Sequence, residues 1–251
     1  MRVDDGQTAA RFCPIGFPRM ASALRISGAA RLGLLLLSAI TGIAGAPAAC
    51  AVEVRCAGSA ALVAAARAAD ASLACDGAHD AISFLASLGL TLREAIPIDI
   101  VARLFDGVRP TAAGFYRESD RRVQILGYEE FRNHQTWFNL PIDRALYRGL
   151  VAHEVAHAVA ARNFRVPSPS IQAKEYIAYV TMLSTLPRDT REKVLSQFPV
   201  EGFEGEWQMD VAIYLADPMR FGVRAYRHFA KLGDAGGYVQ EILAGRILGG
   251  G

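Results

Sequence analysis

Apolar residues recur with a helical period in the region that follows residue 57. Alanine and leucine dominate from Gly58 to Leu90, and their spacing predicts two helices, over residues 59–73 and 78–89. The turn-forming pair Asp76-Gly77 divides the two. This part of the chain is therefore expected to be helical.

The pattern changes to short β-type runs after Pro97. Residues 98–101 have the β-branched content of a strand. Residues 115–118 and 123–126 flank the polar turn Ser119-Asp120-Arg121, as in a β-hairpin. We therefore expect a small antiparallel sheet before the middle of the chain.

The second half returns to helical spacing. Pro141 and Asp143 suit the first turn of a helix that runs to Phe164. After a short break, Ser168 and Pro169 are typical of an N-cap and a first helical residue. The helix that begins there is expected to end at Leu186. The sequence then predicts four more helices, over residues 189–197, 207–216, 218–232 and 238–248. The expected fold class is α+β and mainly helical, with a helical C-terminal region.

The central predicted helix carries the sequence His153-Glu154-Val155-Ala156-His157. Residues four apart lie on one helical face, so the two imidazoles can point to one metal ion. Tetrahedral Zn²⁺ is often bound in this way. Glu154 can then reach a zinc-activated water and act as its general base.

The surroundings of this motif favour a metal site. Apolar residues lie before, within and after it, which predicts a buried helix. Buried histidines and glutamate are unfavourable unless something satisfies them. The alternative is a pair of core histidines that are hydrogen-bonded to the backbone. The apolar positions are Leu146, Leu150, Val151, Val155 and Val159.

A third metal ligand must come from another segment. The metzincin pattern would place glycine and histidine at positions 160 and 163, where this chain has Ala160 and Asn163. Glu175 lies in the second turn of the next predicted helix, which the short break allows to fold back antiparallel. Its alternative role is a solvated residue beside Lys174. The reserve carboxylates are Asp189, Glu192, Glu201 and Asp210.

From the hairpin through the helix that bears Glu175, the chain resembles the gluzincins, the thermolysin-like and aminopeptidase-like HExxH zinc metallopeptidases. The resemblance implies a zincin-like core in which His153, His157 and Glu175 bind Zn²⁺ and Glu154 is catalytic. It also implies an edge strand, assigned to residues 123–126, along which an extended peptide lies by β-addition.

One position departs from the family pattern. Thermolysin-like enzymes have an aspartate four residues after the ligand glutamate, where it orients the first histidine, and this chain has Tyr179 there. Such outer partners affect metal affinity and activity. A transition-state oxyanion would also need a donor besides zinc. The candidates are Tyr176, Tyr179, Tyr214 and His228.

The N-terminal region resembles an export signal. From Met20 the chain has two arginines, the uncharged run of residues 32–43, and small residues in an A-x-A pattern that ends at Ala48 or Ala51. Residues 1–19 are unusual before such a leader, so we expect Met20 to be the true start and 1–19 to be an over-extension.

Two other fates of the leader stay open. It can remain as an uncleaved anchor, or Cys50 can carry a lipid, although Pro47 occupies the position where a lipobox has leucine. The predicted organisation is an over-extended start plus signal peptide over 1–51, an N-terminal helical segment with the first strand over 52–110, and a zincin-like catalytic domain over 111–251.

Removal of the leader changes the charge and the cysteine content. The remaining chain has 22 basic and 23 acidic residues, a net charge of −1, and no basic cluster typical of nucleic-acid binding. Its two cysteines, Cys56 and Cys75, are expected to form a disulfide that joins the ends of the first helix.

The sequence therefore predicts an exported, periplasmic or secreted, zinc-dependent hydrolase that cleaves peptide or protein substrates. We expect no nucleic-acid partner and no stable membrane insertion after cleavage of the leader. Two alternatives are a non-catalytic binding or scaffold protein on a zincin-like fold, and a membrane-tethered chaperone-like accessory. Cleavage specificity and oligomeric state are left open.

Overall fold

The computed structural model describes residues 9–12, 51–105, 107 and 111–249. The predicted signal peptide lies outside these residues, apart from Ala51, which begins a strand. Cleavage of the leader and the start at Met20 therefore stay predictions.

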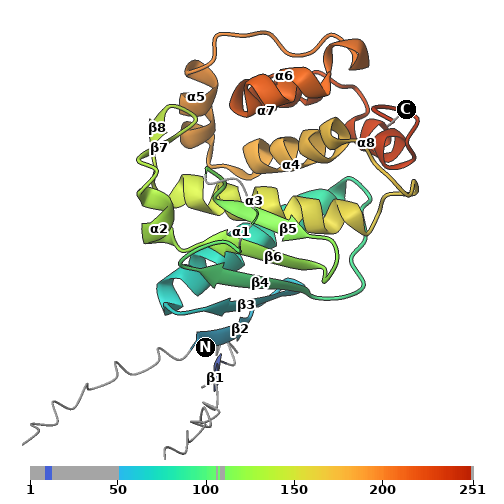
Figure 1. The fold of residues 1–251 in the computed structure, drawn as a ribbon. Helices are drawn as coiled ribbons and strands as arrows, with labels where there is room; N and C mark the ends of the chain where they lie inside the picture. The colour runs from blue at the N-terminus through green and yellow to red at the C-terminus, as the bar shows by residue number, and fades with distance from the viewer. Residues whose placement is uncertain (1–8, 13–50, 106, 108–110, 250–251) are drawn as a thin grey trace, which may run out of the picture.

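The fold is α+β, with one six-stranded mixed sheet and a helical C-terminal half (Figure 1). The strand order is β1-β2-β3-β4-β6-β5. The pairs β3–β4 and β4–β6 are parallel and the other pairs are antiparallel. The prediction of a small antiparallel sheet is wrong, because a helix connects β3 to β4 and returns the chain in the same direction. The strands are β1 (Ala9–Phe12), β2 (Ala51–Arg55), β3 (Ala61–Ala65), β4 (Ile96–Val101), β5 (Gly114–Arg117) and β6 (Arg122–Leu126).

The first predicted helix, 59–73, is wrong over its first half. Residues 61–65 form strand β3, in which Ala61, Val63 and Ala65 are buried and the residues between them are not. Alanine suits a helix better than a strand in isolation, so the local sequence predicts the wrong element. The sheet overrides that preference by pairing β3 on both sides.

The predicted break at Asp76-Gly77 is also wrong. A single helix, α1, extends from Ala68 to Ser87 through this pair. A Cβ added at Gly77 would lie 2.6 Å from the carbonyl oxygen of Arg148 on helix α3. The glycine therefore allows a close crossing of two helices and does not end one.

The helices of the second half stack outward from the sheet (Figure 1). Helix α3 packs against α1, α4, β5 and β6, and α4 packs against α7. A two-stranded hairpin, β7 (Thr136–Trp137) and β8 (Leu140–Pro141), precedes α3. The other helices are α2 (Tyr128–Arg132), α3 (Arg144–Ala161), α4 (Ile171–Thr185), α5 (Arg188–Ser196), α6 (Val211–Ala216), α7 (Pro218–Phe229) and α8 (Ala235–Leu243), with a 3-10 turn at Glu206–Gln208.

Side-chain caps move two predicted helix starts. Asp143 caps α3 by accepting a hydrogen bond from the Leu146 amide at 2.8 Å, and Pro141 belongs to β8. Ser170, and not Ser168, caps α4 by accepting from the Ala173 amide. Asp143 therefore precedes the first turn instead of lying in it, and Ser170 plays the capping role that was predicted for Ser168.

Two aspartates cap C-terminal helices at positions that differ from the predicted helix starts. Asp210 caps α6, so the predicted helix 207–216 is a 3-10 turn followed by a short α-helix. Asp234 accepts a hydrogen bond from the amide of Gly237 and starts α8 at Ala235. The predicted helix 238–248 therefore begins three residues too late, and it ends too late because α8 stops at Leu243.

The predicted disulfide between Cys56 and Cys75 is present. It ties the residue after β2 to the middle of α1, and not to the end of a first helix. The hydrophobic core is continuous from Val54 to Leu248. Among the described residues, no helix combines the length and the apolar character needed to cross a bilayer.

Candidate metal centre

Helices α3 and α4 bring three predicted ligands together. His153 and His157 lie one turn apart on α3, and their Nε2 atoms are 3.2 Å apart. Glu175 lies in the second turn of α4, with Oε2 3.5 Å from His153 Nε2 and Oε1 3.7 Å from His157 Nε2. One ligand atom from each residue lies within 4.8 Å of the other two.

Both histidines are held in the form that binds a metal. Burial lowers the pKa of His153 well below its ordinary value, and His157 lowers it further. Burial, followed by the charge of Lys174, lowers the pKa of His157 to about 4. Both imidazoles are therefore neutral at neutral pH, and protons do not compete for their lone pairs.

Glu154 lies beside this group and is not part of it. Its carboxyl is buried, and burial and the charge of Glu175 raise its pKa well above the ordinary value. Strand β5 passes over it so closely that a Cβ added at Gly114 would lie 2.5 Å from Glu154 Cγ. Glu154 therefore lies close to Glu175 but is not one of the residues whose ligand atoms converge.

The edge strand was assigned to the wrong residues. Residues 123–126 belong to β6, which pairs with β4 on one side and β5 on the other. Among the described strands, β5 ends the sheet on this side. The hairpin itself was predicted, but a sequence does not show which of its two strands turns inward. The strand that could pair with a peptide is therefore β5, the strand that covers Glu154.

Tyr179 takes the place where the gluzincin pattern has an aspartate. Its ring packs against the His153 ring in a T-shaped contact, with centroids 4.5 Å apart. A Cβ added at Gly222 of α7 would lie 2.5 Å from that tyrosine ring, so the glycine makes room for it. His153 Nδ1 is buried and has no hydrogen-bond partner in the described part of the chain. On the Nδ1 side, ring packing therefore orients His153 instead of a hydrogen bond.

The predicted oxyanion donors fall into two pairs. The hydroxyl of Tyr176 and His228 Nδ1 form a hydrogen bond of 2.7 Å in the core, so both have a partner of their own. Tyr179 lies at the site, because its ring packs against the His153 ring. Burial and then the charge of Glu175 raise the pKa of its hydroxyl. The ring of Tyr214 packs against Phe221, so Tyr179 is the better-placed candidate of the second pair.

The donor set fits a zinc ion. Two imidazole nitrogens and one carboxylate oxygen are a common set of three protein ligands that leaves a fourth position for solvent or substrate. The convergence of ligand atoms, with neutral imidazoles, satisfies this chemistry. Among the described residues, the reserve carboxylates do not join a metal-sized group with these histidines; they are Asp189, Glu192, Glu201 and Asp210.

Sequence reasoning missed Gly114 and Gly222, the two glycines that shape the site. A glycine in a strand and a glycine in a helix are ordinary features, and their partners, Glu154 and Tyr179, lie far away in the sequence. A lone glycine at a strand end can mark a close approach of backbone to another group, which was the only available signal for Gly114.

Fold and site together define an α+β protein with a candidate metal centre of two histidines and one glutamate on neighbouring helices. Residues 61–249 match the model of a family of unknown function, DUF6639, and the chain belongs to that family. No curated protein and no solved structure shows significant similarity to it.

Proposed function

We propose that this protein is an exported, zinc-dependent hydrolase with a zincin-like core, and that it cleaves peptides. The observation that carries the proposal is the convergence of His153, His157 and Glu175 next to a buried Glu154, directly under strand β5. A metal site, a proton-exchanging carboxyl and a free sheet edge are the three parts that such a reaction needs.

His153, His157 and Glu175 would hold the cation. When bound, Zn²⁺ supplies a Lewis acid that polarises a carbonyl and lowers the pKa of water towards 7. Glu154 accepts the proton of the attacking water and delivers it to the leaving nitrogen. Burial raises the pKa of its carboxyl, so it can carry a proton near neutral pH.

Strand β5 would position the substrate. The outer side of an edge strand offers backbone N–H and C=O groups to an extended chain. Gly114 of β5 contacts Glu154, so a peptide paired with the outer side of β5 would lie about 4.8 Å from the strand that covers this carboxyl. Because pairing with an edge strand requires amide N–H and C=O groups on the ligand, this geometry favours a peptide as the substrate.

Export is supported by two independent features. The Cys56–Cys75 disulfide is typical of an oxidising compartment, and the sequence from Met20 has the pattern of a cleaved leader. Cell fractionation with mass measurement of the mature protein tests this part. A product that keeps residues 20–51 in the cytoplasm would contradict it.

A scaffold protein that holds zinc without catalysis is the second candidate. Tyr179 favours it, because a tyrosine ring packs against His153 where thermolysin-like enzymes have an orienting aspartate, and His153 Nδ1 has no hydrogen-bond partner among the described residues.

Glu154→Gln separates the two candidates. The change keeps the shape of the side chain but removes its basic oxygen. We expect cleavage of a quenched-fluorescence peptide library to fall by about 10²- to 10⁴-fold, with the zinc content unchanged. A wild-type protein that binds zinc and cleaves no member of the library, under the same conditions, would establish the scaffold.

A further inference from the structure

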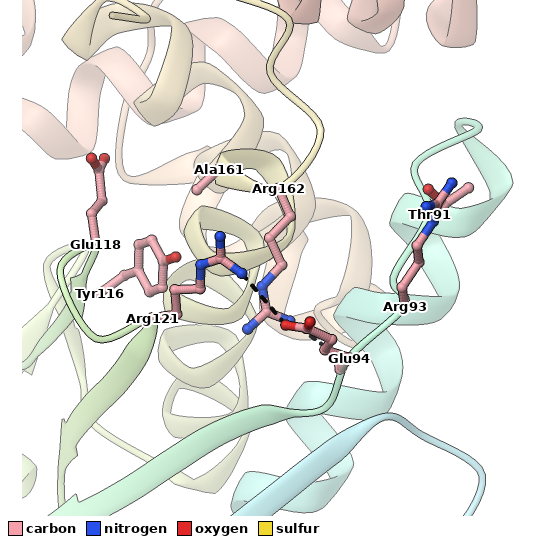
Figure 2. A pocket seen from close by; sticks show the side chains of 8 residues that line it. All are labelled: Thr91, Arg93, Glu94, Tyr116, Glu118, Arg121, Ala161 and Arg162. Carbon is pink, nitrogen blue, oxygen red and sulfur yellow. Dashed lines mark hydrogen bonds and ion pairs between the residues drawn. The ribbon is translucent and has the colours of Figure 1, made fainter. Parts of the chain in front are cut away.

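A second polar site lies next to the candidate metal centre. A pocket of about 550 Å³ opens between the end of α3, the β5–β6 hairpin and the segment 91–94 (Figure 2). The side chains that matter here are Arg93, Glu94, Tyr116, Arg121 and Arg162. They come from three segments far apart in the sequence, and no motif joins them.

The pocket carries an excess of positive charge. Three arginines line it, with two glutamates, Glu94 and Glu118. Glu118 is already paired with Lys174, whose Nζ lies 2.7 Å from its Oε1. Arg93 is exposed and has no ion-pair partner within the part of the chain that the structure describes. The pocket is therefore suited to an anion.

Two side chains just after the end of α3, those of Arg162 and Asn163, hold the segment 91–94 against the pocket. Asn163 exchanges two hydrogen bonds with Thr91, at 3.0 and 2.9 Å. Arg162 donates to the Glu94 carbonyl oxygen at 2.9 Å, and its Nε is buried without a hydrogen-bond partner among the described residues. The site is thus largely formed before any ligand binds.

Arg121 is placed in the pocket by an unusual backbone. Its φ is 54°, in the left-handed region that favours glycine or asparagine. Its guanidinium lies next to that of Arg162, and its Nη1 is 3.5 Å from Glu94 Oε2 (Figure 2). Since that ion pair is long and exposed, it leaves donors of Arg121 available to a second carboxylate.

Two elements lead from the metal centre to this pocket. On α3, Ala161 follows His157 by one turn, about 6 Å along the axis. On β5, Tyr116 follows Gly114, which covers Glu154, by two residues, about 7 Å.

We propose that this pocket binds a carboxylate of the peptide substrate, about two residues from the bond that is cleaved. The inference rests on the proposed function, because it takes a peptide along β5 as the occupant. Arg121 and Arg162 are the ligands of the carboxylate, and Arg93 adds long-range attraction. Arginine binds carboxylates through two parallel hydrogen bonds, which gives direction as well as charge.

Binding of alanine hexapeptides tests the proposal on the zinc-loaded Glu154→Gln protein, in which their cleavage is slowed. Two pairs with both termini blocked carry glutamate or glutamine, two residues before the central bond in one pair and two residues after it in the other. A third pair has a blocked N-terminus and either a free or an amidated C-terminus. We expect one acidic member to bind about tenfold more tightly than its neutral partner, and added salt to reduce the difference. Which pair responds tells a side chain from a chain terminus.

Charge reversal tests the assignment to Arg121. Arg121→Glu should invert the preference, so that a lysine peptide binds more tightly than the glutamate peptide. Arg121→Asn, which tolerates the left-handed backbone, should abolish it. Arg188→Gln removes a surface arginine that is paired with Glu192 on α5, and it should keep the preference.

The outcomes separate this proposal from the proposed function. Equal binding of all acidic and neutral peptides overturns the pocket assignment, and so does a preference that survives Arg121→Glu; peptide cleavage by the wild-type protein can still stand. Selective binding of acidic peptides together with no cleavage by the wild-type protein supports the pocket and overturns the hydrolase.

Discussion

Helix α4 contributes one residue to each of two buried histidine clusters, which differ in how their polar atoms are paired. Tyr176 and His228 satisfy each other with a hydrogen bond of 2.7 Å, and Tyr238 packs against both rings. The preceding residue, Glu175, faces the two histidines of α3 at 3.5 and 3.7 Å, longer than an ordinary hydrogen bond.

The difference shows how a metal site can be told from core histidines. Burial is similar, since His153 and His228 have the same 8% exposure. Burial also lowers the pKa of both. Tyr176 and His228 form a hydrogen bond with each other. The metal-ligand atoms of His153, His157 and Glu175 instead converge within 4.8 Å of one another. Burial alone therefore does not identify a ligand, but convergence does.

Acid should destabilise the metal-free protein through His157. The pKa of His157 is about 4 in the folded protein and 6.5 in its ordinary state. Between these values the unfolded chain binds a proton that the folded chain does not, so stability is full above pH 6.5 and falls as the pH drops to about 4. The loss is up to about 3 kcal/mol.

Denaturant unfolding of the chelated protein at several pH values measures this effect. His157→Gln should remove part of the slope between pH 6.5 and 4. An identical slope in wild type and variant would show that His157 takes up its proton at the same pH in the folded and the unfolded protein, contrary to a pKa lowered by burial.

Gly114→Ala should weaken catalysis more than folding. The new Cβ would lie 2.5 Å from Glu154 Cγ and 2.8 Å from Oε1, so the carboxyl must shift. We expect peptide cleavage to fall by about tenfold, as for other small displacements of a catalytic group. Gly233→Ala, where a Cβ would meet nothing within 4 Å, is the matched control. Equal activity of the two variants would contradict the placement of β5 over Glu154.

Tyr176→Phe should have the smallest effect and should spare the metal. It removes the partner of a buried His228 nitrogen, so the free energy of unfolding should fall by about 1–2 kcal/mol. Zinc content should not change, although the substituted residue is the immediate neighbour of Glu175. Loss of zinc from this variant would contradict the claim that the Tyr176–His228 pair takes no part in metal binding.

The local parts of the site could be predicted from the sequence. The spacing of His153 and His157 fixes their common face on any helix, and the length of the break before α4 suggested Glu175. The hairpin was predicted over residues 115–126 and is found over residues 114–126, and the disulfide was predicted as well. Each depends on nearby residues or on a simple count, so no tertiary information was needed.

The parts that depend on tertiary contacts could not be predicted. The alanine-rich residues 61–65 become a strand only because β2 and β4 pair with them. Gly77 was predicted to break a helix, because the sequence does not show that it lies close to the carbonyl oxygen of Arg148. The choice of β5 over β6 as edge strand depends on β4, and the basic pocket joins Arg93, Arg121 and Arg162 from three separate segments.

The zinc content of the purified mature protein tests the central claim most directly. Elemental analysis should give about one zinc per chain in the wild-type protein, and His153→Ala should lose it because one of three ligands is gone. His228→Gln, which changes the buried histidine of the other cluster, should keep it. Absence of zinc from the wild-type protein after zinc loading, or equal zinc in all three proteins, would contradict the account.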